Sequence, residues 1–132
     1  MTRNMFPYLI LVLSALSSVG CNGTQTYGHL HQDIQLPSGK RFKVLDFEKQ
    51  YSGTTPLTIT LKYESDLPIE NNAELRAQIR EVWDVFKAEV DSLKFSRAVV
   101  TAQRSFSFLG FEYNKWWSYV FSKRNDDSWI ID

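Results

Sequence analysis

One thiol has surroundings that indicate a specific chemistry: Cys21 is the only cysteine among the 132 residues. It closes the run Leu16-Ser17-Ser18-Val19-Gly20-Cys21, directly after an apolar stretch that starts near the N-terminus. A lone cysteine in an exported chain is explained by a free thiol, by a disulfide to another chain or by a covalent modification. The residues in front of Cys21 favour the last of these.

The first 20 residues have the three parts of a secretory leader. Arg3 and the amino terminus are positive, residues 5–16 are apolar, and Gly20 is a small residue in front of the cut. The apolar run is shorter than the about 20 residues that a membrane-spanning helix needs. With Cys21 next, the segment resembles the lipobox of bacterial lipoproteins, in which a signal peptidase cuts before the cysteine and the thiol carries a diacylglyceryl group.

The resemblance implies that residues 1–20 are a signal peptide and that Cys21 is the acylated N-terminus of the mature chain. Such lipoproteins carry palmitate-like acyl chains, and two or more of these hold a protein on a membrane where one does so only marginally. Asn22, in place of aspartate, follows the cysteine. For a lipoprotein this implies a place in the bacterial cell envelope, on the outer membrane and facing the periplasm.

Charge and composition narrow the function of the remaining chain. The 15 basic residues are balanced by 15 acidic ones, which argues against a nucleic-acid-binding face or a polybasic lipid patch. Residues 21–40 are poor in apolar side chains and are expected to form a flexible tether spanning roughly 25 Å. His29 and His31, the only histidines, could form a metal pair, but with only Asp33 nearby they are expected to be solvated and to bind no metal.

Residues 41–132 are expected to form a single α+β domain. Alternating apolar residues predict two strands, the clearer one at Leu57, Ile59, Leu61 and Tyr63. Residues 51–56 are rich in turn formers and connect the two strands. A helix is predicted over about 72–93, with Asn71 as the N-cap and Glu74 reaching back to it.

The predicted helix carries one apolar stripe at spacings of three and four. Its members are Leu75, Ile79, Val82, Phe86, Val90 and Leu93, with Trp83 beside them. Three further strands follow, with turns at Gly110 and at residues 125–128. The predicted architecture is an antiparallel sheet of about five strands in ββαβββ order, packed on one long amphipathic helix, with the other sheet face open to water.

Aromatic residues are concentrated after the helix. Ten of the 17 that follow the leader lie in residues 95–132, more than one helix can cover, so some are expected to form an exposed binding surface. We expect Trp117, Tyr119 and Phe121 to face the core. The candidates for contact with a partner are Phe108, Phe111 and Trp116.

No catalytic site is predicted. The domain contains no nucleophile motif, no phosphate loop, no histidine base and no cofactor motif. Paired acids such as Asp126 and Asp127 belong to a predicted turn, where acids are normally solvated.

Residues 41–132 are also similar to small uncharacterised bacterial lipoproteins that have a capped helix of the type Ala73-Glu74-Leu75…Val82-Trp83-Asp84-Val85-Phe86 and a closing Asp127-Ser128-Trp129 turn. Two function classes follow. The first is a lipid-anchored, non-catalytic module that binds an envelope protein through an aromatic sheet face, as an immunity protein would. The second is a protein with a pocket between helix and sheet that binds or turns over a small apolar molecule.

Overall fold

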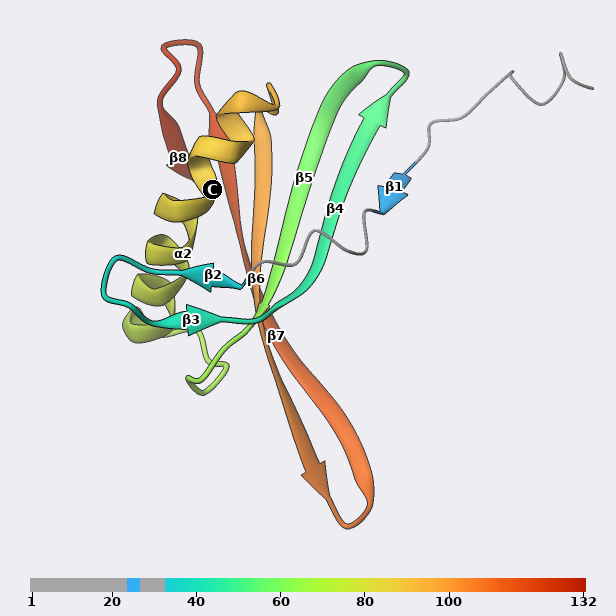
Figure 1. Cartoon of the computed structure of the whole chain (residues 1–132), viewed down its shortest axis with the longest axis vertical. Coiled ribbons are helices and arrows are strands. Elements are labelled where there is room, and N and C mark those ends of the chain that lie inside the picture. The colour runs from blue at the N-terminus through green and yellow to red at the C-terminus, as the bar shows by residue number, and fades with distance from the viewer. Residues whose placement is uncertain (1–23, 27–32) are drawn as a thin grey trace, which may run out of the picture.

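The computed structural model describes residues 24–26 and 33–132; Cys21, His29 and His31 lie outside them. One helix packs against one face of a twisted sheet (Figure 1). The elements, in chain order, are β1 (Thr24–Thr26), β2 (Ile34–Gln35), β3 (Arg41–Phe42), β4 (Val44–Ser52), β5 (Thr55–Glu64), α2 (Ala73–Ser92), β6 (Arg97–Phe108), β7 (Phe111–Lys123) and β8 (Trp129–Ile131). The α+β class and the ββαβββ order of the main elements are confirmed.

The main sheet has the strand order β1-β4-β5-β6-β7-β8, and β2 pairs with β3 in a separate small hairpin. The expectation of an antiparallel sheet is wrong at one pair: β5 and β6 run parallel, with Ile59 opposite Ala98 and Glu64 opposite Gln103. Helix α2 connects these two strands, and a helical crossover returns the chain to the same end of the sheet. The sheet is therefore mixed.

The core lies between α2 and one face of the sheet. The predicted helix stripe is buried from Leu75 to Val90, and Trp83 stacks on Phe121 with ring centroids 4.3 Å apart. On β5, Ile59, Leu61 and Tyr63 are buried. The opposite sheet face carries residues such as Thr58, Thr60, Lys62 and Gln103 by strand alternation, so the face left without a helix is polar rather than aromatic.

The ends of α2 explain its length. Asn72, not Asn71, is the N-cap: its side chain accepts a hydrogen bond from the Leu75 amide at 2.9 Å. Asn71 instead accepts a hydrogen bond from the Tyr119 hydroxyl at 3.2 Å. At the other end Lys94 has a φ of 66°, and the amides of Lys94 and Phe95 donate to carbonyls of the last turn. This is the left-handed helix end that glycine usually makes.

The described end of the predicted tether belongs to the domain. Residues 33–40 form β2 and the turn before β3, and Leu36 is only 3% exposed within the core. Leu36 and the Leu36–Lys40 backbone hydrogen bond hold this turn in place. The boundary predicted at residue 41 therefore lies too late in the sequence.

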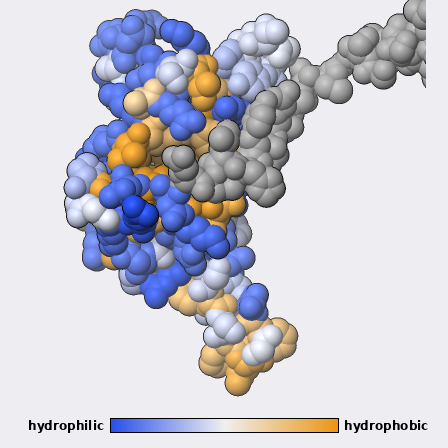
Figure 2. Space-filling model, in the orientation of Figure 1, coloured by the Kyte–Doolittle hydropathy of each residue, from blue (hydrophilic) through white to orange (hydrophobic). Residues whose placement is uncertain are grey.

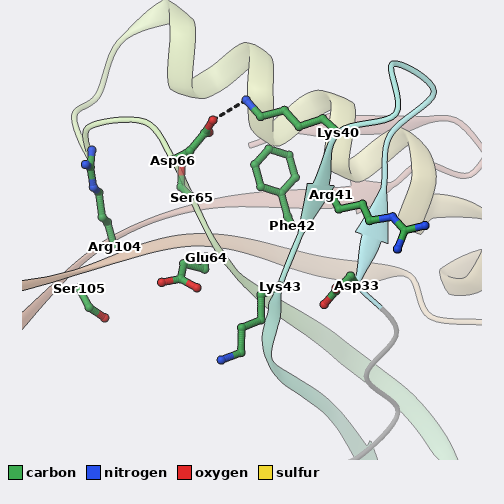
Figure 3. A pocket seen from close by; sticks show the side chains of 10 residues that line it. All are labelled: Asp33, Lys40, Arg41, Phe42, Lys43, Glu64, Ser65, Asp66, Arg104 and Ser105. Atoms are coloured by element: carbon green, nitrogen blue, oxygen red, sulfur yellow. Dashed lines mark ion pairs between the residues drawn. The ribbon is translucent and has the colours of Figure 1, made fainter.

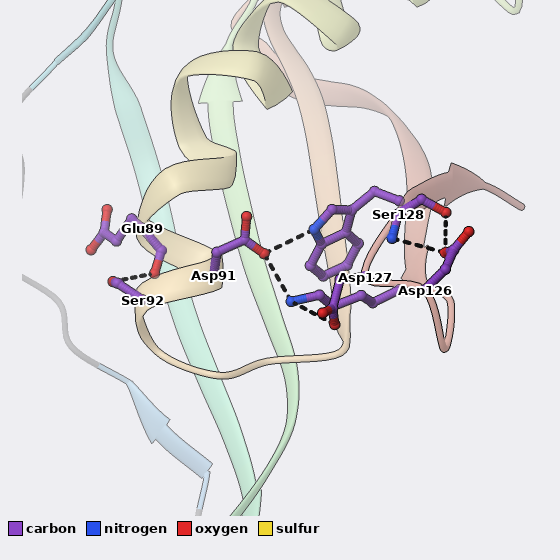
Figure 4. Close-up of polar contacts among 8 residues, drawn as sticks. Glu89, Asp91, Ser92, Asp126, Asp127 and Ser128 are labelled. Carbon is purple, nitrogen blue, oxygen red and sulfur yellow. Dashed lines mark hydrogen bonds and ion pairs between the residues drawn. The ribbon is translucent and has the colours of Figure 1, made fainter.

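Strand β8 is attached to the end of α2 by one carboxylate (Figure 4). Asp91 accepts hydrogen bonds from the Trp129 indole nitrogen at 2.9 Å and from Lys123 Nζ at 3.2 Å. Burial alone would raise the pKa of Asp91, but these two donors outweigh it and hold the pKa below its ordinary value. At the neighbouring turn, Asp126 accepts from the amide and hydroxyl of Ser128. Asp126 thus stabilises the β7–β8 turn, as the solvated-turn interpretation requires.

Candidate functional site: the β6–β7 hairpin

Strands β6 and β7 extend beyond the rest of the sheet as a long two-stranded hairpin (Figure 1). The parallel pairing with β5 ends at Gln103, and the pairing of β7 with β8 covers only residues 121–123. In the described part of the chain, residues 104–115 therefore pair only with one another, while Trp116 and Trp117 pair with Gln103 and Ala102 at the base of the hairpin. A hairpin without further strands or a covering helix exposes both its faces and both its edges.

The two faces of the projecting segment differ in chemistry. The register from Arg97–Ser122 to Phe108–Phe111 has no shift, so side chains alternate strictly between the faces. One face continues the helix-covered side of the sheet and carries Arg104, Phe106, Phe108, Phe111, Tyr113, Lys115 and Trp117; we call it the aromatic face. The other face carries Ser105, Ser107, Glu112, Asn114 and Trp116.

Contacts along the aromatic face agree with this alternation. The rings of Phe106 and Tyr113 stack at 5.2 Å between centroids. The Arg104 guanidinium lies 5.5 Å and the Lys115 ammonium 5.8 Å from the centre of the Phe106 ring. Such cation–π contacts hold the two cations over the ring. On the other face, Ser105 donates to Asn114 at 2.7 Å.

The end of the hairpin is the most exposed apolar part of the described structure (Figure 2). Phe108, Leu109 and Phe111 are 67%, 81% and 76% exposed. We call residues 108–111 the tip. Water hydrates all three apolar side chains, which is unfavourable unless another apolar phase covers them.

The structure brings together two of the three predicted contact residues. Phe108 and Phe111 are direct cross-strand partners on the aromatic face. Trp116 is exposed as predicted, at 64%, but it lies on the opposite, polar face. Trp117, expected in the core, is 36% exposed, because the hairpin carries it past the part of the sheet that α2 covers.

Sequence reasoning included Leu109 only as part of an exposed Phe108–Phe111 loop, and it missed Tyr113. Leu109 stands in a turn, where side chains are usually polar, and its neighbour Gly110 supplied the only turn signal. Tyr113 shares its strand phase with Phe111 and Trp117, so a strict count of alternation back from Phe121 would have placed all of them on one face. By the same count, Trp116 lies on the opposite face from these residues.

The turn itself is strained at one residue. Leu109 and Gly110 have φ values of 49° and 79°, the positive angles that a tight two-residue hairpin turn requires at both central positions. Glycine and asparagine adopt such angles readily, whereas a leucine side chain pays a steric cost there. Leu109 is thus a poor residue for the turn and a fully hydrated apolar side chain.

A solvent-open hollow of about 580 Å³ lies at the base of the hairpin (Figure 3). Arg104 and Ser105 line it together with Asp33, and Lys40 pairs with Asp66 at 2.5 Å. Burial alone would raise the pKa of Asp66. The hydrogen bonds from Lys40 and Gln78 have the larger effect, so the pKa lies below its ordinary value.

Gln78 joins helix α2 to the end of β5 beside this hollow. Its amide donates to Asp66 at 2.7 Å and accepts from Ser65 at 2.6 Å and Tyr63 at 3.0 Å. Burial, with the Asp66 charge second, raises the pKa of the Tyr63 hydroxyl. All four groups have partners within the cluster, which fits a structural brace better than a reactive site.

The described residues give little support for a metal site, a membrane-spanning helix or an enclosed pocket between helix and sheet. They contain no group of three or more metal-ligating side chains, and their helix is not long and apolar enough to cross a membrane. The region between helix and sheet is filled by core residues such as Ile79, Val82 and Trp83, each at most 5% exposed. A second, solvent-open hollow of about 610 Å³ lies between α2 and strands β7 and β8, where Trp83 of the helix and Phe121 and Trp129 of the strands line it.

Comparisons of the chain with protein-family models, with curated proteins and with solved structures find no match.

Proposed function

We propose that the chain is a lipid-anchored, non-catalytic docking module of the bacterial envelope, and that the aromatic face and tip of the β6–β7 hairpin are its contact surface. The observation that carries the proposal is the projecting hairpin, with Phe108, Leu109 and Phe111 at least two-thirds exposed at its end. Cys21 is the proposed anchor, on the strength of the lipobox-like run in front of it.

The position of the hairpin favours a role in docking, because the fold does not need the hairpin end. The core is complete without the tip, because every fully buried large side chain lies in residues 59–121 outside the segment 104–117. A long apolar hairpin end adds nothing to that core and increases the risk of aggregation. A contact that buries it would offset this cost.

The pocket alternative, in which a small apolar molecule binds between helix and sheet, has weaker support. Trp83 lies between Phe86, Phe121 and Trp129, with ring centroids 4.3–6.2 Å apart. These rings fill the interior between helix and sheet, and the hollow that Trp83, Phe121 and Trp129 line is open to solvent rather than enclosed. The docking surface is therefore the function we put forward.

Sedimentation with isolated envelopes tests the docking surface. The Cys21→Ser chain, which has no acylation site, should sediment with envelope fragments, and Phe108→Ser/Phe111→Ser in the same background should abolish most of this association. The matched control is Leu45→Ser/Leu57→Ser, which removes two apolar side chains that are 37% and 45% exposed on other strands. Equal loss in both double variants, or none in the hairpin variant, would refute the proposed surface.

The anchor is tested separately. Cys21→Ser in the full chain should abolish labelling with a fatty-acid analogue and release most of the protein on repeated washing, because dilution dissociates the reversible tip contact but not an acyl anchor. Undiminished labelling of the variant would show that Cys21 is not the acylated residue.

A further inference from the structure

We infer that the surface that the hairpin enters is a phospholipid interface: the tip inserts into the boundary of the acyl chains, and Arg104 and Lys115 lie at the level of the phosphates. The inference rests on the proposed docking function and specifies what the aromatic face contacts. A protein groove is the competing occupant, and the experiment below separates the two.

The chemical order along the aromatic face matches that of a membrane interface. Phe108 and Phe111 flank the turn, the Phe106–Tyr113 pair follows two residues behind, and the Arg104–Lys115 pair follows four residues behind. At ~3.4 Å per residue these levels lie about 7 and 14 Å behind the tip pair. Interfacial elements bury their apolar side about 5–10 Å into the headgroup boundary, with aromatic rings and then cations above it. The hairpin has the same order.

The charge of the aromatic face also fits a phospholipid surface. The aromatic face of the projecting segment carries two cations and no acid, because Glu112, the one acid of the segment, lies on the opposite face. Phosphate-bearing headgroups complement such a face, and each nearby Lys or Arg contributes about 1 kcal/mol on an anionic surface. Two cations do not make a polybasic patch, so the apolar tip must supply most of the binding.

Leu109 lies at the foremost point of the hairpin. The residue is strained in the turn and 81% exposed, so neither local conformation nor packing accounts for a leucine there. Backbone strain at an exposed position points to a role outside folding. An apolar side chain at the foremost point of a hairpin is suited to entering the acyl boundary.

The reach of the chain permits insertion into the membrane that holds the proposed anchor. Asp33 lines the hollow at the hairpin base with Arg104 and Ser105. The 12 residues from Cys21 to Asp33 extend to about 40 Å, more than the distance from that base to the tip. Strand β1, however, pairs Thr24 with Gln50 near the opposite end of the sheet. An anchored chain must therefore release the three residue pairs of β1 from β4 when its tip inserts.

The experiment uses protein-free vesicles and residues 21–132 carrying Cys21→Ser, because the apolar leader predicted at residues 1–20 would itself partition into the vesicles. This chain has no other cysteine, so Leu109→Cys provides a unique site for an environment-sensitive fluorophore, and Leu57→Cys provides a control site on β5. Vesicles of equimolar phosphatidylglycerol and phosphatidylcholine should shift the emission of the label at position 109 to the blue. The label at position 57 should not respond.

Unlabelled variants measured by vesicle sedimentation identify the groups involved. Phe111→Ala should weaken partitioning at least about tenfold, because a phenyl side chain leaves the apolar phase. Trp116→Ala, an aromatic change on the polar face of the same hairpin, should weaken it much less. Arg104→Gln/Lys115→Gln should weaken partitioning roughly thirtyfold on the anionic vesicles and little on pure phosphatidylcholine.

Three outcomes overturn the inference. In the first, envelopes bind through the tip but protein-free vesicles do not, so the occupant is a protein and the docking function stands. In the second, Trp116→Ala and Phe111→Ala lose equal affinity, so the aromatic face is not the inserted one. In the third, neither envelopes nor vesicles bind, and the docking function fails with the inference.

Discussion

Leu109 combines a φ of 49° with an 81% exposed side chain. At this position an asparagine would form, with Gly110, the Asn-Gly pair that tight hairpin turns favour. Leu109→Asn should therefore raise the free energy of unfolding by about 0.5–1 kcal/mol, since it relieves the steric cost of a left-handed leucine. Urea unfolding would measure this gain.

Leu57→Asn is the control for that measurement, because Leu57 is also exposed but lies in β5 with extended backbone. No stabilisation is expected there. A Leu109→Asn chain less stable than the wild type would mean that the leucine serves the fold, and the argument from strain would be lost.

Asp91 makes stability depend on pH. Because its folded pKa is depressed below its unfolded value of about 3.9, its contribution is present above that value and is lost as pH falls through the folded pKa. Asp91→Asn should therefore lower the free energy of unfolding at pH 7, and the difference from wild type should shrink at about pH 3. Denaturant unfolding at the two pH values measures this, and an undiminished difference at acid pH would assign the effect to packing rather than charge.

At the scale of elements, the buried face of α2 forms one side of the core. Phe86 is 5% exposed and meets Phe47 and Trp83 with ring centroids 5.7 and 6.2 Å apart. Phe86→Ala should cost about 3–5 kcal/mol by leaving a cavity. Lys87→Ala, on the exposed side of the same turn, should change stability by no more than about 0.5 kcal/mol. Similar thermal melts for the two variants would show that the helix face is misassigned.

The helix and the strand could be predicted, because hydrophobic periodicity and helix capping depend only on residues close together in the sequence. The stripe from Leu75 to Val90 specifies a helix, and the alternation from Leu57 to Tyr63 specifies a strand, whatever surrounds them. The predicted N-cap was wrong by one residue, because Asn71 and Asn72 have the same side chain. Only the hydrogen bond from the Leu75 amide shows that Asn72 is the cap.

The pairing of strands was beyond a local argument. Whether β6 joins β5 in parallel depends on the helix returning the chain to the same end of the sheet, which periodicity does not encode. The projection of the hairpin depends on where β5 stops, at Glu64, relative to β6. One signal was available: strands of 12 and 13 residues are about twice the usual length.

At the scale of the whole molecule, the hairpin tip and the β4–β5 turn lie at opposite ends of the sheet (Figure 1). Strand β1 pairs beside that turn, with Thr24 opposite Gln50. A chain anchored at Cys21 with β1 in place would hold its tip away from its own membrane. Release of β1 would allow the tip to turn back toward it, so the short β1 pairing decides which surface the tip can reach.

The aromatic face and tip of the hairpin, rather than the exposed apolar residues of other strands, are proposed as the contact surface in the envelope. The most direct test of this proposal is a photo-crosslinking amino acid at position 111 or position 57 of the full acylated chain in cells, followed by quantification of all adducts, protein and lipid together. We predict abundant adducts from position 111 and background levels from position 57. Equal yields at the two positions, or background at both, would contradict the proposal.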